Sequence, residues 1–110
     1  MTDDAKPAYR PPTPDLRAAA AIGARYHRRR KEALRQLRKS NFGWPVLLAM
    51  ADAEPRSIGR IRVAAALAAM PAKSMPATIR IQLTQLRFAD GLRLNGLGAA
   101  QRKLLCRLFP

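Results

Sequence analysis

The sequence predicts an all-α protein, with one long basic N-terminal helix followed by a compact four-helix domain. Two observations predict this class. Apolar side chains recur at helical spacing along residues 13–40 and again in shorter segments of residues 41–110, and no sustained alternation of apolar and polar residues predicts a strand. Proline and glycine interrupt the pattern at short intervals after residue 40, so the second part is predicted to consist of short helices.

The charge of the chain points to an anionic partner. The 110 residues carry a formal net charge of +14. Residues 56–110 hold ten basic groups and a single acid, Asp90. Charge of one sign on so small a protein repels itself unless a partner neutralises it, whereas charge that only confers solubility is normally mixed in sign. Nucleic acid is the predicted partner, ahead of an anionic membrane or an acidic protein.

The residues that support catalysis or metal binding are scarce. Cys106 and His27 are the only cysteine and histidine, which excludes an intramolecular disulfide and a zinc site of about four soft ligands. We find no Ser/His/Asp set, no paired carboxylates and no Walker motif. We therefore expect no enzymatic activity, no cofactor and no small-molecule substrate. Neither a signal peptide nor an apolar run of about 20 residues is visible, so we expect a cytoplasmic protein without a membrane partner.

The N-terminal part divides into an arm and a helix. Residues 1–12 contain three prolines and mixed charge, which is typical of a disordered arm. The long helix is predicted over residues 13–40, because Thr13 suits the N-cap and Pro14 the first turn. Its last residues, before Ser40, are strongly basic, as the helix dipole favours.

The long helix is amphipathic and carries nine of the 21 Lys/Arg residues. Residues 25–39 include eight Lys/Arg and one acid, Glu32. A helix that buries one side and aims a row of cations outward is suited to lie against a polyanion. At roughly 100° per residue, the apolar arc holds Leu16, Ala19, Ile22, Gly23, Tyr26, Ala33, Leu34 and Leu37. The opposite arc holds Arg17, Arg25, Arg28, Arg29, Lys31, Arg35, Arg38 and Lys39.

Four shorter helices are predicted in residues 41–110, the helical DNA-binding domain. Trp44 is expected to be buried; the alternative is a stacking platform for unpaired bases. The last helix is expected to turn Ala100, Leu104 and Leu108 inward. The expected helices are Trp44–Ala51, Ser57 or Gly59 to Met70, Pro76–Arg87 and Ala99–Phe109.

Two turns are candidates for phosphate binding. In the turn of residues 95–98, glycines let the backbone approach closely, and free N–H groups at the following helix start attract an anion. An ordinary turn with a glycine cap explains the same residues. The turn of residues 71–76 supplies Lys73 and Ser74. The remaining predicted DNA contacts are Arg93, Asn95, Gly96, Leu97, Gly98, Arg102 and Lys103 around the second turn and Arg25, Arg28, Arg29 and Arg35 on the long helix.

Several segments, taken in order, resemble a known family. They cover residues 11–109 and match the actinobacterial integration host factor family. The chain resembles a divergent member, because residues 72–76 lack the glycines that are usual there and residues 92–95 hold one arginine, Arg93, where three are usual. The matching segments are Pro11-Pro12-Thr13-Pro14 before an Ala/Arg-rich helix, Ile58-Gly59-Arg60-Ile61-Arg62-Val63, Leu67-Ala68-Ala69-Met70-Pro71, and Gly96-Leu97-Gly98 followed by Gln101-Arg102-Lys103.

The resemblance implies a helix-two-turns-helix motif and sequence-tolerant binding of double-stranded DNA. It also implies nucleoid association, DNA bending or bridging, and assistance to a site-specific recombinase. We expect a monomer off DNA. An RNA- or ribosome-associated module remains an alternative. Leu92, Leu94 and Leu97 either pack into the domain or include an apolar wedge that enters a minor-groove step.

Overall fold

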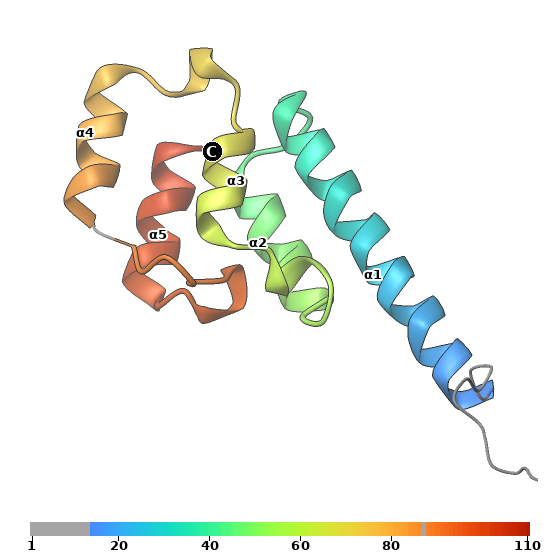
Figure 1. Cartoon of the computed structure of the whole chain (residues 1–110). Helices are drawn as coiled ribbons and strands as arrows, with labels where there is room; N and C mark the ends of the chain where they lie inside the picture. Colours follow the sequence, from blue (N-terminus) through green and yellow to red (C-terminus); the bar gives the residue numbers. More distant parts are fainter. Residues whose placement is uncertain (1–13, 87) are drawn as a thin grey trace, which may run out of the picture.

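The computed structural model describes residues 14–86 and 88–110, and within them it is all-helical. Figure 1 shows one long helix leaning against a group of short ones. The predicted arm, residues 1–12, lies outside the described residues, as does Thr13. The α-helices are α1 (Pro14–Arg38), α2 (Trp44–Ala53), α3 (Val63–Ala69), α4 (Ala77–Leu86) and α5 (Ala99–Leu108). Three short 3-10 helices lie between them: η2 (Ile58–Arg60), η3 (Ala72–Ser74) and η4 (Leu94–Gly96).

The long helix ends where the sequence predicts, but a serine makes the turn. Ser40 has a φ of 60°, the left-handed conformation that usually follows a helix end. The Asn41 N–H donates to the Gln36 carbonyl over 3.0 Å, which satisfies one of the free carbonyls of the last turn. Glycine usually occupies this left-handed position, but here Ser40 occupies it, three residues before Gly43.

Only the C-terminal half of α1 packs against the domain. Ala33 and Leu37 are each 1% exposed, whereas Leu16 is 61% and Ile22 43% exposed. The prediction of a buried apolar arc along the whole helix is therefore wrong for its N-terminal half. The reason is geometric: α1 contacts η2 and α3 and then extends past them, as Figure 1 shows.

Trp44 is buried in the hydrophobic core, as predicted. Its side chain is fully buried, and its ring centroid lies 6.2 Å from that of Phe109. The Trp44 backbone N–H donates to the Phe109 carbonyl over 2.9 Å. A Cβ on Gly43 would lie 2.2 Å from the Pro110 carbonyl oxygen, so this contact requires glycine. Residues 43–44 and 109–110 thus close the core together.

The predicted third helix, Ser57 or Gly59 to Met70, is interrupted. Residues 58–60 form η2, Ile61 and Arg62 are extended, and α3 begins only at Val63. The extended residues pair with the segment before η4 instead of continuing a helix. The interruption therefore results from a tertiary contact that local helical spacing does not reveal.

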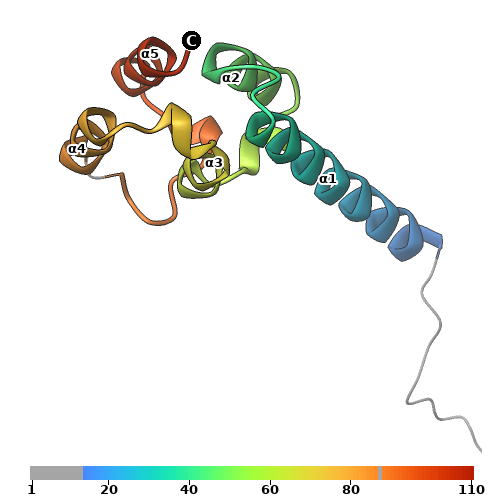
Figure 2. The same ribbon diagram turned by 90° about the horizontal axis from the view of Figure 1, so that it is seen from above.

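Helix α4 lies at the edge of the domain. It contains no fully buried residue, and Ile81 is 58% exposed. The predicted inward residues Ile79, Leu83 and Leu86 are half-buried. In Figure 2, α1 lies on one side of α3 and α4 on the other.

Helix α5 is rotated relative to the prediction. Leu105 and Phe109 are buried, whereas Ala100 is exposed and Leu104 and Leu108 are half-buried. Leu104 and Leu105 are adjacent and lie on different faces of the helix, so the sequence alone allows either face to be buried. Because Phe109 packs against Trp44, the face that carries Leu105 is the one turned to the core.

Candidate nucleic-acid interface

Two loops that are distant in sequence are joined beside α1. The Val63 N–H donates to the Leu92 carbonyl and the Leu94 N–H to the Ile61 carbonyl, each over 2.9 Å. These bonds form an isolated antiparallel bridge between Arg62 and Arg93. The bridge fixes the backbone at residues 61–63 and 92–94, so the basic side chains on both loops are held near one another.

An arginine side chain strengthens this junction. Arg93 Nη1 donates to the Arg60 carbonyl oxygen over 2.6 Å. The Arg93 side chain is half-buried, whereas Arg60 and Arg62 are exposed. Arg93, a predicted DNA contact, therefore also positions the loop that carries the other two arginines.

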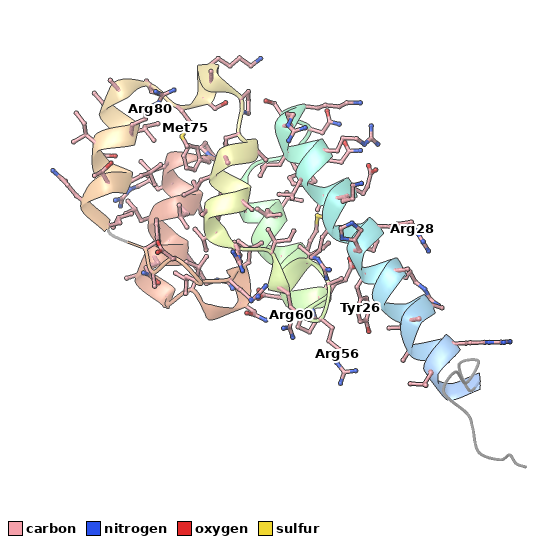
Figure 3. The ribbon with its side chains drawn as sticks, in the orientation of Figure 1. Tyr26, Arg28, Arg56, Arg60, Met75 and Arg80 are labelled. Carbon is pink, nitrogen blue, oxygen red and sulfur yellow. The ribbon has the colours of Figure 1, made fainter. Side chains whose placement is uncertain are left out.

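The junction and α1 form the walls of a basic groove. Its α1 wall supplies two cations and a histidine, and the opposite wall supplies two arginines. In Figure 3, Arg60 of η2 and Tyr26 of α1 lie on neighbouring elements, and Arg56 points away from the domain. We call this surface the basic groove. It is lined by His27, Arg30, Lys31, Leu34, Arg60, Ile61, Arg62 and Ala65.

The electrostatics of the basic groove suit a phosphate. None of its lining residues is acidic. Among the described residues, Arg30, Lys31, Arg60 and Arg62 form no ion pair within 4.0 Å. Unpaired cations on two facing walls raise the local positive potential and attract a polyanion.

Two of the four α1 arginines predicted to contact DNA already have acidic partners. Arg29 forms two bonds with Glu54, at 2.9 Å from Nε and 2.6 Å from Nη2. Arg35 binds Glu32 on the same helix, with a closest approach of 2.7 Å. Arg25 and Arg28 are exposed and form no ion pair among the described residues. Arg25 and Arg28 are therefore the better candidates on this part of α1.

The Arg29–Glu54 pair fixes α1 to the end of α2. The hydrogen bond from Arg29 holds the pKa of the Glu54 carboxyl below its ordinary value, while partial burial opposes the shift. Ser57 Oγ lies 3.3 Å from the same carboxylate. Because the folded-state pKa is depressed, the pair stabilises the fold above the unfolded-state pKa. That contribution is lost as the pH falls through the folded-state pKa.

We predict that Glu54→Gln weakens the acid dependence of stability. The wild-type chain should lose at most about 1 kcal/mol more than the variant between about pH 6 and pH 3, since the pair is partly solvated. Urea unfolding at each pH measures the difference. Asp90→Asn is the control, because Asp90 is exposed and lies outside the ion pairs among described residues. Parallel curves for the wild type and Glu54→Gln would contradict the prediction.

The amides of the predicted glycine turn are already engaged. Gly96 N–H donates to the Arg93 carbonyl over 2.9 Å, and Gly98 N–H donates to Gln101 Oε1 over 3.0 Å. The Leu97 N–H also has a partner, the Leu94 carbonyl at 3.3 Å. These three N–H groups are therefore not free for a phosphate, whereas phosphate binding by the N–H groups at the start of α5 stays a prediction. No described glycine has a positive φ, which favours the ordinary turn.

The leucines around this turn face the core. Leu94 is fully buried, Leu97 is 8% exposed and Leu92 is half-buried. A wedge that enters DNA requires an exposed apolar tip, so Leu94 and Leu97 do not provide one here. Asn95 is exposed, and its side-chain amide lies 3.4 Å from the Pro55 carbonyl.

Of the two predicted contacts on α5, Arg102 forms an ion pair and Lys103 forms none among the described residues. Arg102 binds Asp52 of α2 through two bonds, at 3.0 and 2.6 Å. Lys103 is exposed, near Arg107 on the outer side of α5. Lys103 does not line the basic groove. Helix α5 packs against α2, whereas the groove lies between α1 and the η2–α3 junction.

The two predicted phosphate turns do not converge. Lys73 and Ser74 lie in η3 at the end of α3, and the 95–98 turn lies where α5 begins, at the opposite end of the domain in Figure 1. Lys73 is exposed; the Ser74 N–H donates to the Pro71 carbonyl over 2.9 Å. The structure therefore does not bring Lys73 and Ser74 into one site with Arg93.

None of the eight residues that line the basic groove is among the predicted DNA contacts. Of its four cations, only Lys31 belongs to the predicted basic arc, and Arg60 and Arg62 appear only in the segments that carry the family resemblance. The signals in the sequence are the basic run of residues 28–31 and the Arg-Ile-Arg of residues 60–62, but their proximity depends on the packing of α1 against η2 and α3. The described residues contain no group of three or more potential metal ligands and no helix long and apolar enough to cross a membrane.

Comparison of the chain with protein-family models, with curated proteins and with solved structures found no match. The resemblance to the actinobacterial integration host factor family thus stays a prediction. The structure itself supports a coarser class, an all-helical protein with an uncompensated basic groove.

Proposed function

We propose that this protein binds double-stranded DNA without catalysing a reaction, mainly through phosphate contacts in the basic groove. The observation that carries the proposal is the meeting of unpaired cations from α1 and from the η2–α3 junction, with no acid among the lining residues. Phosphate contacts position a protein on DNA but carry no sequence information directly. Binding is therefore largely sequence-tolerant.

The length of α1 supports a duplex as the ligand. Its 25 residues extend about 37 Å at 1.5 Å per residue, roughly one turn of double-stranded DNA. In the basic groove a duplex meets Arg30 and Lys31 of α1, whereas Arg28 points away from the domain in Figure 3. Contacts spread over such a length favour bending of the duplex, which is the action of an architectural, nucleoid-associated protein.

The finer assignments belong to the same proposal. The succession of α3, η3 and α4 has the order of a helix-two-turns-helix motif, and the family resemblance implies assistance to a site-specific recombinase. Nucleoid association in the cytoplasm follows from tight binding of DNA. A circular-permutation gel shift with random and attachment-site duplexes tests these assignments, since equal mobility at all positions excludes bending.

We predict a steep salt dependence of duplex binding. If about five phosphates are neutralised, the logarithm of the association constant falls against the logarithm of salt concentration with a slope of about −4.5. Fluorescence anisotropy of a labelled random duplex between low and moderate salt measures the slope. A slope near zero would rule out binding through phosphates.

Two competition assays separate the alternatives. Unlabelled double-stranded RNA of equal length should displace the protein from DNA only at higher concentration; stronger displacement than by DNA would favour the RNA- or ribosome-associated alternative. Anionic vesicles should not bind at the same protein concentration, because the apolar side of α1 is rich in alanine. Co-sedimentation with vesicles would instead favour a membrane partner.

A further inference from the structure

His27 lies in the basic groove, although it is not among the predicted DNA contacts. On α1, positions 27, 30, 31 and 34 recur at spacings of three and four residues, so they form one stripe along the helix. All four residues of this stripe line the groove, and Leu34 at its end is half-buried. His27 is exposed, and its imidazole has no hydrogen-bond or ion-pair partner among the described residues. The ring is therefore open to a ligand in the groove.

The charged residues that line the groove with His27 are all cations. The elements packed against α1 are η2 and α3, and α3 holds no ionisable residue. Glu54, after the end of α2, is bonded to Arg29 and does not line the groove. The ordinary pKa values of lysine and arginine lie above about 10, whereas that of histidine is about 6.5, so histidine is the one residue type in the groove that titrates near neutral pH. The charged neighbours are Arg30 and Lys31 on the α1 wall and Arg60 and Arg62 on the opposite wall.

We propose that His27 is a phosphate contact of the basic groove, and that DNA binding by this protein is coupled to the uptake of a proton. The inference rests on the DNA binding proposed above. A neutral imidazole has one N–H donor and one acceptor, whereas an imidazolium has two donors. A phosphate oxygen accepts hydrogen bonds and carries negative charge, so it favours the imidazolium. The proton and the DNA each strengthen the binding of the other, and the affinity for DNA rises as the pH falls.

The groove has room for this contact, and the contact does not involve the core. The volume of the groove is about 200 Å³, several times the share of about 30 Å³ that one water molecule occupies in the liquid. Ala33 and Leu37, the buried residues of α1, are not part of the stripe. Changes at position 27 are therefore expected to alter DNA binding while the fold stays intact.

Anisotropy titrations of the full chain on a random duplex at about pH 6 and about pH 8, at equal salt, test the coupling. The wild type should bind about fivefold more tightly at the lower pH, and its salt slope should be steeper there by up to about 0.9, because one further phosphate contact forms. His27→Gln should remove both differences, and His27→Arg should bind at the higher pH at least as tightly as the wild type does at the lower pH. A pH dependence that is unchanged in His27→Gln would overturn the proposal.

Moving the histidine separates a contact in the groove from a general gain of charge. Ala65 and Ala68 are both exposed on α3, but Ala65 lines the basic groove, whereas Ala68 lies on the side of α3 toward α4. In a His27→Gln background, Ala65→His should restore the pH dependence from the opposite wall, and Ala68→His should not. Equal recovery from the two positions would show that any added charge has this effect, and would overturn a specific contact. Circular dichroism checks that each variant is folded.

Titration calorimetry measures the proton directly. At about pH 7, in two buffers of different ionisation enthalpy, binding of the duplex should take up a fraction of a proton per wild-type chain and none per His27→Gln chain. Equal uptake by both chains would overturn the assignment to His27.

The failures of the two proposals are distinguishable. If the wild type binds DNA with the predicted salt slope but with equal affinity at the two pH values, the coupling is wrong and the proposed function stands. If the wild type shows no salt-dependent DNA binding at either pH, the proposed function fails, and the proton coupling fails with it.

Discussion

Replacing Arg60 and Arg62 together with glutamine is expected to weaken duplex binding roughly 50-fold at about 0.1 M salt, because two phosphate contacts and their released counterions are lost. Both side chains are exposed, form no ion pair among the described residues and line the basic groove. The salt slope should also become shallower, by about 1.8. Anisotropy titrations over a range of salt concentrations measure both quantities.

The matched control is Lys103→Gln with Arg107→Gln, which removes the same charge from the outer side of α5. Its affinity should fall only a few-fold, through the general loss of positive potential. A larger loss from the α5 pair than from Arg60 and Arg62 would move the interface to α5 and contradict the assignment of the basic groove. Thermal unfolding of both variants checks that the fold is intact.

The largest expected effect on stability comes from Trp44→Ala. The indole ring is fully buried against Phe109, so its removal leaves a cavity at the point where α2 and the chain after α5 meet. We expect a loss of about 3–5 kcal/mol in the free energy of unfolding and a melting temperature lower by about 15 °C or more. Urea and thermal unfolding followed by circular dichroism measure these quantities without using tryptophan fluorescence.

Two controls separate ring volume from other effects of the substitution. Trp44→Phe keeps an aromatic ring, and Trp44 Nε1 has no hydrogen-bond partner among the described residues, so this change should cost much less than Trp44→Ala. Val46→Ala alters the same helix at a side chain that is 47% exposed and should change stability by no more than about 0.5 kcal/mol. Equal destabilisation by all three would contradict the central packing role of Trp44.

Helix positions could be predicted from local signals, whereas packing partners could not. Pro14 and the residues around Ser40 bracket α1, and Pro45 marks the first turn of α2. The break between η2 and α3 has no such signal, because the extended residues at 61–62 are held by hydrogen bonds to the distant 92–94 segment. The rotation of α5 likewise depends on Phe109 reaching Trp44.

The sequence predicted a basic surface, but the predicted DNA contacts do not include the residues that line the basic groove. The cationic run on α1 was evident from composition, and Arg28 and Arg25 remain free to bind among the described residues. The pairing of Arg29 with Glu54 and Arg102 with Asp52 was not predictable, since each pair joins residues that are far apart in sequence. The number of arginines can be read from the sequence, but which of them form ion pairs with acidic side chains depends on the fold.

The contact between residues 43–44 and 109–110 has a consequence for synthesis of the protein. Ribosomes synthesise a chain starting from its N-terminus, at about 5–20 residues per second. Helix α1 can form as it emerges, but the pocket around Trp44 stays open until Phe109 arrives to accept its N–H bond and cover its ring. The core is thus completed only after residue 109 has been synthesised, and the basic α1 is exposed to cellular RNA before the rest of the domain has folded.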